Sequence, residues 1–114
     1  MALKPQTDFS SFLALDIRIG KIVNVEESQA KKPTYRITAD FGPDIGQKVT
    51  IAAYKHYSPA ELQGLKVAGV MNIGIRKMGP ETSEFLLLGV PNEANEAVPL
   101  TVFKADAKLG GKIF

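Results

Sequence analysis

The chain has no cysteine among its 114 residues and only one histidine, and these two shortages exclude several kinds of site. Without cysteine there is no disulfide, no thiol nucleophile and no thiolate-bound metal. His56 has no second imidazole to share a metal with, and scattered serines and aspartates do not make it part of a triad. No glycine-rich phosphate loop is present. We therefore expect no enzymatic activity, no bound metal and no cofactor.

The sequence also lacks an apolar run long enough to span a membrane, and its opening residues, MALKPQTDFSSF, contain no signal-peptide core. We therefore expect a cytoplasmic protein without membrane insertion. Its length, 45% hydrophobic content and 23% charged content are those of one globular domain, spanning residues 1–114 with a flexible stretch at 1–7. A net charge of +2 is too small to indicate nucleic-acid binding by itself.

Alternating apolar and polar residues predict three strands in the first half of the chain, over residues 15–26, 35–41 and 48–54. The apolar positions of the first strand, expected to share one face, are Leu15, Ile17, Ile19, Val23 and Val25. Lys21 falls in the inward register, so either Gly20 shifts the register or the lysine lies at the rim. The core-facing positions expected in the third strand are Val49, Ile51 and Ala53.

A capping box marks the clearest helix of the sequence. Ser58 stands at the N-cap, Pro59 at N1 and Glu61 at N3, and Gly64 is expected to end the helix. An N-terminal helix is expected to begin at Asp8 or Ser10 and to run through residue 15. Further strands are predicted over residues 66–73 and 82–90, with a C-terminal extension strand over 97–103.

The order of these elements predicts an all-β OB-fold, a five-stranded Greek-key barrel with a short helix between its third and fourth strands. That helix favours the OB-fold over an SH3-like barrel. The fourth and fifth strands are apolar on both faces, although a barrel strand needs only one apolar face. The other face must be covered by the chain's own termini or by a second copy, and we favour a twofold homodimer. The residues expected to form this apolar peptide-binding or dimer surface are Val70, Met71, Met78, Phe85 and Leu87.

Paired cations stand in two connections that meet at one end of an OB-fold. Lys31 and Lys32 lie between the first and second predicted strands. Arg76 and Lys77 lie at the expected hairpin tip between the fourth and fifth. Such an arrangement suits a phosphate backbone, because each neutralised phosphate releases counterions. Alternatively, these cations only keep the surface soluble.

Two arginines and two tyrosines leave alternatives open. Arg18 and Arg36 point outward on adjacent strands, so they contact a ligand or are neutralised by Asp16 and Asp40. The tyrosines that flank Lys55 and His56 stack on unpaired bases or pack against the helix; they are Tyr54 and Tyr57.

Several segments resemble the tRNA-binding domain family and its stand-alone CsaA branch of secretion-associated chaperones. LDIRIGKIVNVEE, from Leu15, is similar to the opening strand of tRNA-binding domains appended to some aminoacyl-tRNA synthetases. The residues that match a loose N-x-x-x-R-K-M-x-G…S pattern are Asn72, Arg76, Lys77, Met78, Gly79 and Ser83. SEFLLLG, DFGPDIG and LGGKI resemble CsaA sequences.

The resemblance implies a homodimeric OB-fold that binds tRNA or another structured RNA, or unfolded precursor proteins destined for export. The residues expected to contact nucleic acid are Arg18, Lys31, Lys32, Arg36, Asn72, Arg76, Lys77 and Ser83. The chain departs from the CsaA pattern at Gly74 and Ile75, where prolines are usual, and at Glu81, where apolar or aromatic residues are common. The departures predict a more mobile loop and a lower local positive potential.

Overall fold

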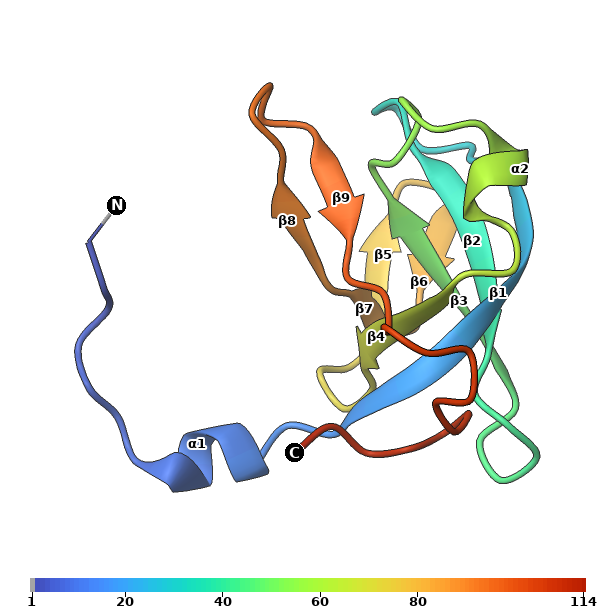
Figure 1. Ribbon diagram of the computed structural model, residues 1–114. Helices are drawn as coiled ribbons and strands as arrows, with labels where there is room; N and C mark the ends of the chain where they lie inside the picture. The colour runs from blue at the N-terminus through green and yellow to red at the C-terminus, as the bar shows by residue number, and fades with distance from the viewer. Residues whose placement is uncertain (1) are drawn as a thin grey trace.

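Five antiparallel strands of the computed structural model, which describes residues 2–114, form a sheet in the order β3-β2-β1-β4-β7 (Figure 1). These strands are β1 (Ile17–Glu27), β2 (Tyr35–Asp40), β3 (Gln47–Ala52), β4 (Lys66–Val70) and β7 (Leu86–Leu87). The two ends of the sheet meet, because the Glu84 N–H donates to the Val49 carbonyl at 2.7 Å. The nearly closed barrel confirms the predicted OB-fold.

The predicted helices are present and short. The helix α2 (Pro59–Leu62) connects β3 to β4, and its capping box is complete. The Ser58 Oγ accepts from the Glu61 N–H at 3.2 Å, and the Glu61 carboxylate accepts from the Ser58 N–H at 2.9 Å. The helix α1 (Phe9–Leu13) ends before the predicted residue 15. Residues 2–8 form no helix or strand and run away from the barrel (Figure 1), and Met1 lies outside the described residues.

The predicted strands 66–73 and 82–90 differ from the structure. The first ends at Val70, and the second is divided among β6 (Glu81–Ser83), β7 and β8 (Gly89–Pro91). The division arises because β6 pairs with β5 (Arg76–Met78) in a separate hairpin, while β8 pairs with β9 (Ala97–Pro99). The predicted tail strand 97–103 is therefore reduced to β9.

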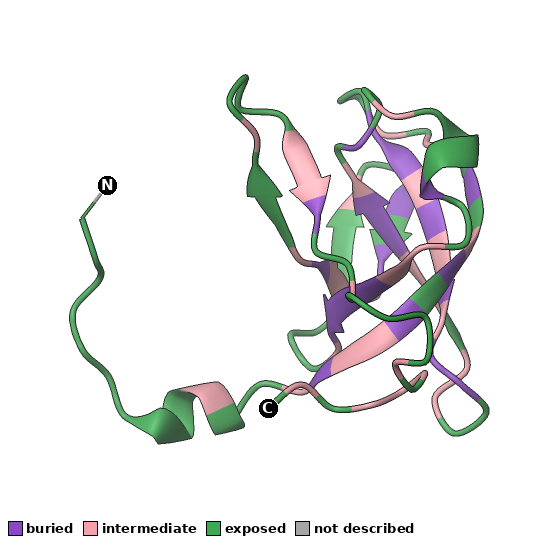
Figure 2. Cartoon of the chain, viewed as in Figure 1, coloured by how far each residue is buried: buried purple, intermediate pink, exposed green. Residues whose placement is uncertain are grey.

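The main core contains two phenylalanine rings that require two glycines. Phe41 and Phe85 pack edge to face with their centroids 5.0 Å apart. A Cβ atom added to Gly20 would lie 2.6 Å from the Phe41 ring, and one added to Gly69 would lie 2.7 Å from the Phe85 ring. The two glycines, on β1 and β4, thus make room for the rings inside the barrel. Figure 2 shows this buried interior running through the strands.

A second apolar cluster lies on the outer face of the sheet. Its buried members are Ile17, Ala68 and Val70, and residues of both terminal segments, Phe12 and Ile113, pack against it. The C-terminal segment pairs with β1, since the Ile113 N–H donates to the Ile17 carbonyl at 2.9 Å. The chain's own termini therefore cover part of this face.

The assignment of Phe85 and Leu87 to an apolar surface is wrong. Both are buried in the main core, whereas Leu86 and Leu88 face the outer cluster. Since both faces of this segment are apolar, alternation could not decide which set points inward. Val70 is also covered, at 3% exposure, while Met71 and Met78 are half-buried.

The inward registers of β1 and β3 also differ from prediction. In β1, Lys21 shares the outer face with Ile17 and Ile19 by simple alternation, and the β-bulge between Ile22 and Asn24 then shifts the register so that Val25 joins Ile22 in the main core. In β3, Thr50 lies opposite the fully buried Ile37 and therefore faces the core. Val49, Ile51 and Ala53 belong to the other face, where Ile51 is covered by the β5–β6 hairpin through a bond to Ser83.

Candidate nucleic-acid interface

The loop formed by residues 28–34 and the β5–β6 hairpin contact each other at one end of the barrel. The Gln29 N–H donates to the Glu81 Oε2 at 2.8 Å. Gln29 lies two residues before Lys31, and Glu81 is the register partner of Met78, which follows Lys77. Two connections far apart in sequence, each with exposed cations, are thus joined directly.

The cations of these two connections remain exposed. The side chains are exposed and form no ion pair within residues 2–114; they are Lys31, Lys32, Arg76 and Lys77. Arg76 and Lys77 belong to β5 rather than to the hairpin tip, which consists of Gly79 and Pro80. Neighbouring strand residues point to opposite faces, so Arg76 lies near Ser83, at 3.4 Å, and Lys77 points the other way.

Arg18 and Arg36 are both neutralised within the chain. The Arg18 guanidinium donates to the Asp16 carboxylate at 2.6 Å and to the Gly110 carbonyl at 2.9 Å. The Arg36 guanidinium donates to Glu81 at 2.8 Å and to Glu26 at 3.2 Å. Asp40, the partner expected for Arg36, instead accepts from the Gly42 N–H.

The carboxylate of Glu81 accepts hydrogen bonds from the loop 28–34 and from β2, and these bonds affect its ionisation. Its pKa is lowered chiefly by the hydrogen bond from the Gln29 N–H and then by that from Arg36. The pKa of Arg36 is raised by the same pair. Both shifts favour the charged forms, so the pair is ionised at neutral pH.

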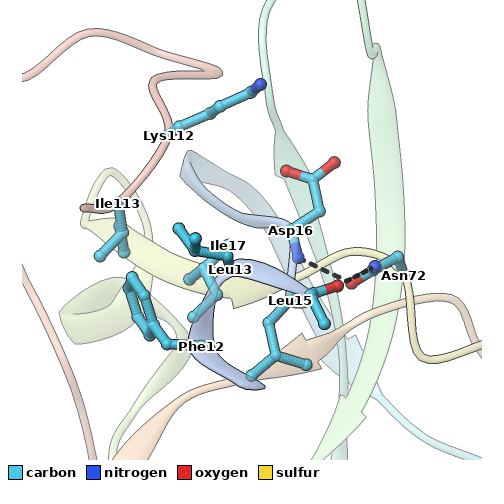
Figure 3. A pocket seen from close by; sticks show the side chains of 9 residues that line it. Phe12, Leu13, Leu15, Asp16, Ile17, Asn72, Lys112 and Ile113 are labelled. Atoms are coloured by element: carbon cyan, nitrogen blue, oxygen red, sulfur yellow. Dashed lines mark hydrogen bonds between the residues drawn. The ribbon is translucent and has the colours of Figure 1, made fainter. Parts of the chain in front are cut away.

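The exposed Asn72 and the buried Ser83 hold the chain before the β5–β6 hairpin and at its end. The Asn72 side chain accepts from the Asp16 N–H at 2.7 Å and donates to the Ala14 carbonyl at 2.8 Å, which fixes the chain after β4 against the start of β1 (Figure 3). The Ser83 side chain is fully buried and lies 3.1 Å from the Thr50 hydroxyl. In this conformation Ser83 supports the hairpin and has no surface for a ligand.

A third connection, over residues 53–58, lies beside the loop 28–34. Lys55 forms an ion pair with Glu27, and the Tyr35 hydroxyl donates to the Tyr57 carbonyl at 2.9 Å. Tyr54 is buried in the core, which raises its pKa, and Tyr57 packs partly against the core. Both tyrosines therefore pack against the protein's own core. His56 is exposed beside the Tyr57 ring.

Two hollows lie away from these loops. One, of about 300 Å³, has apolar walls from Ile45, Met71 and Ile75, and its charged lining consists of Arg18, Lys48, Asp16 and Glu84. The other, of about 350 Å³, opens between α1 and the C-terminal segment (Figure 3). Its apolar lining consists of Phe12, Leu13, Ala14, Leu15, Ile17 and Ile113, and its polar lining of Asp16, Asn72 and Lys112.

Sequence reasoning missed the contribution of Glu81, which it treated only as a lowering of positive potential. Its position opposite Gln29 depends on the pairing of β5 with β6, whereas the sequence predicts the hairpin tip at Arg76 and Lys77. Within residues 2–114 no cluster of three or more His, Cys, Asp or Glu could hold a metal ion. No helix in the same range has the length and apolar character needed to cross a membrane.

Comparison with known proteins identifies relatives for nearly the whole barrel. The family model described as "Putative tRNA binding domain" matches residues 17–112. The crystal structure of chaperone CsaA from Bacillus anthracis is 33% identical with a TM-score of 0.88, covering 96% of this chain and 100% of that one. The CsaA chaperone protein of Picrophilus torridus is 30% identical, with the same TM-score and coverage. The methionine--tRNA ligase of Methanoculleus marisnigri is 33% identical over 92% of this chain, which spans only 16% of that relative's length.

Proposed function

Because the chain belongs to the tRNA-binding domain family, we propose that it binds tRNA or another structured RNA as a single domain and without catalysis. The observation that carries the proposal is the contact between Gln29 and Glu81, which joins the loop of Lys31 and Lys32 to the hairpin of Lys77. The cations of both connections are exposed and unpaired. Together they offer a phosphate backbone several contacts at one end of the barrel.

The residues have different parts in this proposal. Lys31, Lys32, Arg76 and Lys77 contact phosphates directly. Arg36 lies beside them and contributes less, because Glu81 and Glu26 already neutralise it. Arg18 lies at the other end of β1, where it is bonded to Asp16 and Gly110, and contributes least. Asn72 and Ser83 act by holding the backbone that carries the cations. Recognition by phosphates and shape means that binding depends more on salt than on sequence.

The test is a filter-binding titration with bulk tRNA at several salt concentrations. Each double variant, K31A/K32A and R76A/K77A, should bind more weakly and lose a salt slope of roughly 0.9 per phosphate contact removed. K104A/K108A is the charge-matched control, because both lysines are exposed and Lys108 begins the stretch 108–111 that approaches Phe41 and Gly42, at the opposite end of β2 from loop 28–34. Wild-type binding without a salt slope, or double variants no weaker than the control, would refute the proposal.

A second function, binding of unfolded precursor proteins for export, is favoured by the apolar hollow that Met71 and Ile75 line. Ile75 is 66% exposed, and both basic and acidic side chains line this hollow. The solved relatives described as CsaA chaperones support this alternative. If it holds, suppression of aggregation of a model substrate should survive R76A/K77A and be lost in Ile75→Asp. The opposite pattern would leave RNA as the ligand.

We also propose that two copies associate through the outer apolar face and that the protein acts in the cytoplasm, where tRNA and unexported precursors are found. Leu13 and Leu15, which line the hollow of Figure 3, are 65% and 44% exposed, and Phe9, on the same helix as Leu13, is 71% exposed. Such a grouping of large apolar side chains favours contact with a second copy.

A further inference from the structure

Glu81 is the one charged residue among residues 2–114 that is buried, with 4% of its surface exposed. A buried carboxylate is costly unless it is hydrogen-bonded and paired. Its presence here therefore depends on the groups that surround it.

Both oxygens of the Glu81 carboxylate are occupied by partners from other segments. The Oε2 accepts from the Gln29 N–H at 2.8 Å, and the Oε1 accepts from the Arg36 Nη2 at 2.8 Å and Nε at 3.2 Å. Glu81 belongs to β6, Gln29 to the loop 28–34 and Arg36 to β2. One carboxylate thus connects a loop, a hairpin and a barrel strand.

The bond to Gln29 is the only hydrogen bond that joins loop 28–34 to the hairpin within the described chain. The loop is otherwise held at its base, where the Thr34 hydroxyl donates to the Ser28 Oγ at 2.9 Å. Without Glu81, the lysines of the loop would be free to move relative to Lys77.

We propose that Glu81 is a positioning residue for RNA, whose carboxylate clasps loop 28–34 to the β5–β6 hairpin so that Lys31, Lys32 and Lys77 meet one phosphate backbone together. The inference rests on the proposed RNA-binding function. A negative charge at such a site would ordinarily repel RNA, but Arg36 neutralises it. The clasp then favours binding by reducing the conformational freedom that the loop loses when RNA is bound.

Two variants separate the clasp from the charge. Glu81→Gln and Glu81→Leu remove the same negative charge and leave Arg36 with Glu26 as its one carboxylate partner among the described residues, but only glutamine keeps an acceptor for the Gln29 N–H. Leucine has a similar volume and suits a buried position, so it should fold. We expect E81L to bind bulk tRNA about tenfold more weakly with a shallower salt slope, and E81Q to stay within about threefold of wild type.

Hydrogen exchange of the Gln29 amide gives a readout that needs no RNA. It should accelerate in E81L and stay protected in E81Q, with a cooperative thermal transition in each variant showing that both barrels are folded. Equal tightening of tRNA binding in both variants, or unchanged Gln29 exchange in E81L, would overturn the clasp while leaving the RNA function standing. If wild type shows no salt-dependent RNA binding, the proposed function fails first, and the role of Glu81 toward RNA fails with it.

Discussion

The Thr50 hydroxyl group helps to close the barrel between β3 and the chain that precedes β7. Thr50 is 1% exposed, and its hydroxyl donates to the Phe85 carbonyl at 2.9 Å and lies 3.1 Å from the Ser83 hydroxyl. Buried hydroxyls are tolerated only with partners. These bonds join β3 to the chain that precedes β7, so a polar residue on the core face has a structural purpose.

Replacing Thr50 by valine keeps the shape of the side chain and removes these bonds. We expect T50V to lower the free energy of unfolding by about 1–2 kcal/mol, because the Phe85 carbonyl and Ser83 hydroxyl lose a buried partner. Urea denaturation measures this loss. Thr38→Val, at a half-buried position of β2, is the control, and equal effects of the two changes would contradict the assignment.

The lowered pKa of Glu81 makes part of the stability depend on pH. Because the folded pKa lies below the ordinary value of 4.5, the unfolded chain takes up the proton first as pH falls. The stabilisation is complete above the ordinary value and is lost as pH falls through the folded pKa. The charged groups around this carboxylate are Arg36, Glu26 and Glu84.

The matching measurement compares wild type with Glu81→Gln by urea denaturation from about pH 6 to about pH 3. The difference in unfolding free energy should shrink as the pH falls. Glu61, whose pKa is also lowered, is present in both proteins and cancels in the difference. A difference that stays constant over this range would show that the Glu81 charge does not stabilise the fold.

At the scale of elements, β1 and β4 approach the core rings closely because Gly20 and Gly69 have no side chains. Gly20→Ala would place its Cβ atom 2.6 Å from the buried Phe41 ring. We expect a loss of about 1–3 kcal/mol in unfolding free energy from this overpacking.

Phe41→Leu provides the matched test of that clash. If the Phe41 ring causes the loss in Gly20→Ala, the double variant should be more stable than the sum of the two single changes predicts. Additive losses, measured by the same denaturation, would point instead to an effect of the backbone at Gly20.

The sequence patterns predict some elements and fail on others for identifiable reasons. Ser58, Pro59 and Glu61 locate α2 because a capping box is a local signal. The pattern places Phe85 and Leu87 on the wrong face because their neighbours are equally apolar. The contact between Glu81 and Gln29 joins residues 52 positions apart, so no local pattern carries it.

At the scale of the whole molecule, the outer face of the barrel is only partly covered and leaves large apolar side chains exposed to solvent. Phe9 stacks on Phe12 with centroids 5.9 Å apart, and Phe12 reaches the outer cluster, but Phe9 and Leu13 stay largely exposed. A domain of this size buries about two-thirds of its unfolded surface, so an added interface would contribute much to its stability. The N-terminal segment leaves the barrel on this side (Figure 1), where a second copy could use it.

The double change Phe9→Asp and Leu13→Asp tests that association. Both side chains are exposed in one copy, so the barrel should keep its fold, whereas two charges buried in a dimer interface would prevent pairing. Light scattering should give the mass of a dimer for wild type and of a monomer for the variant. Val90→Asp, at a position 47% exposed on β8, is the control and should leave the mass unchanged. A wild-type chain that scatters as a monomer would mean that its own termini suffice to cover the outer face. The hollow between α1 and the C-terminal segment (Figure 3) would then be open to other ligands.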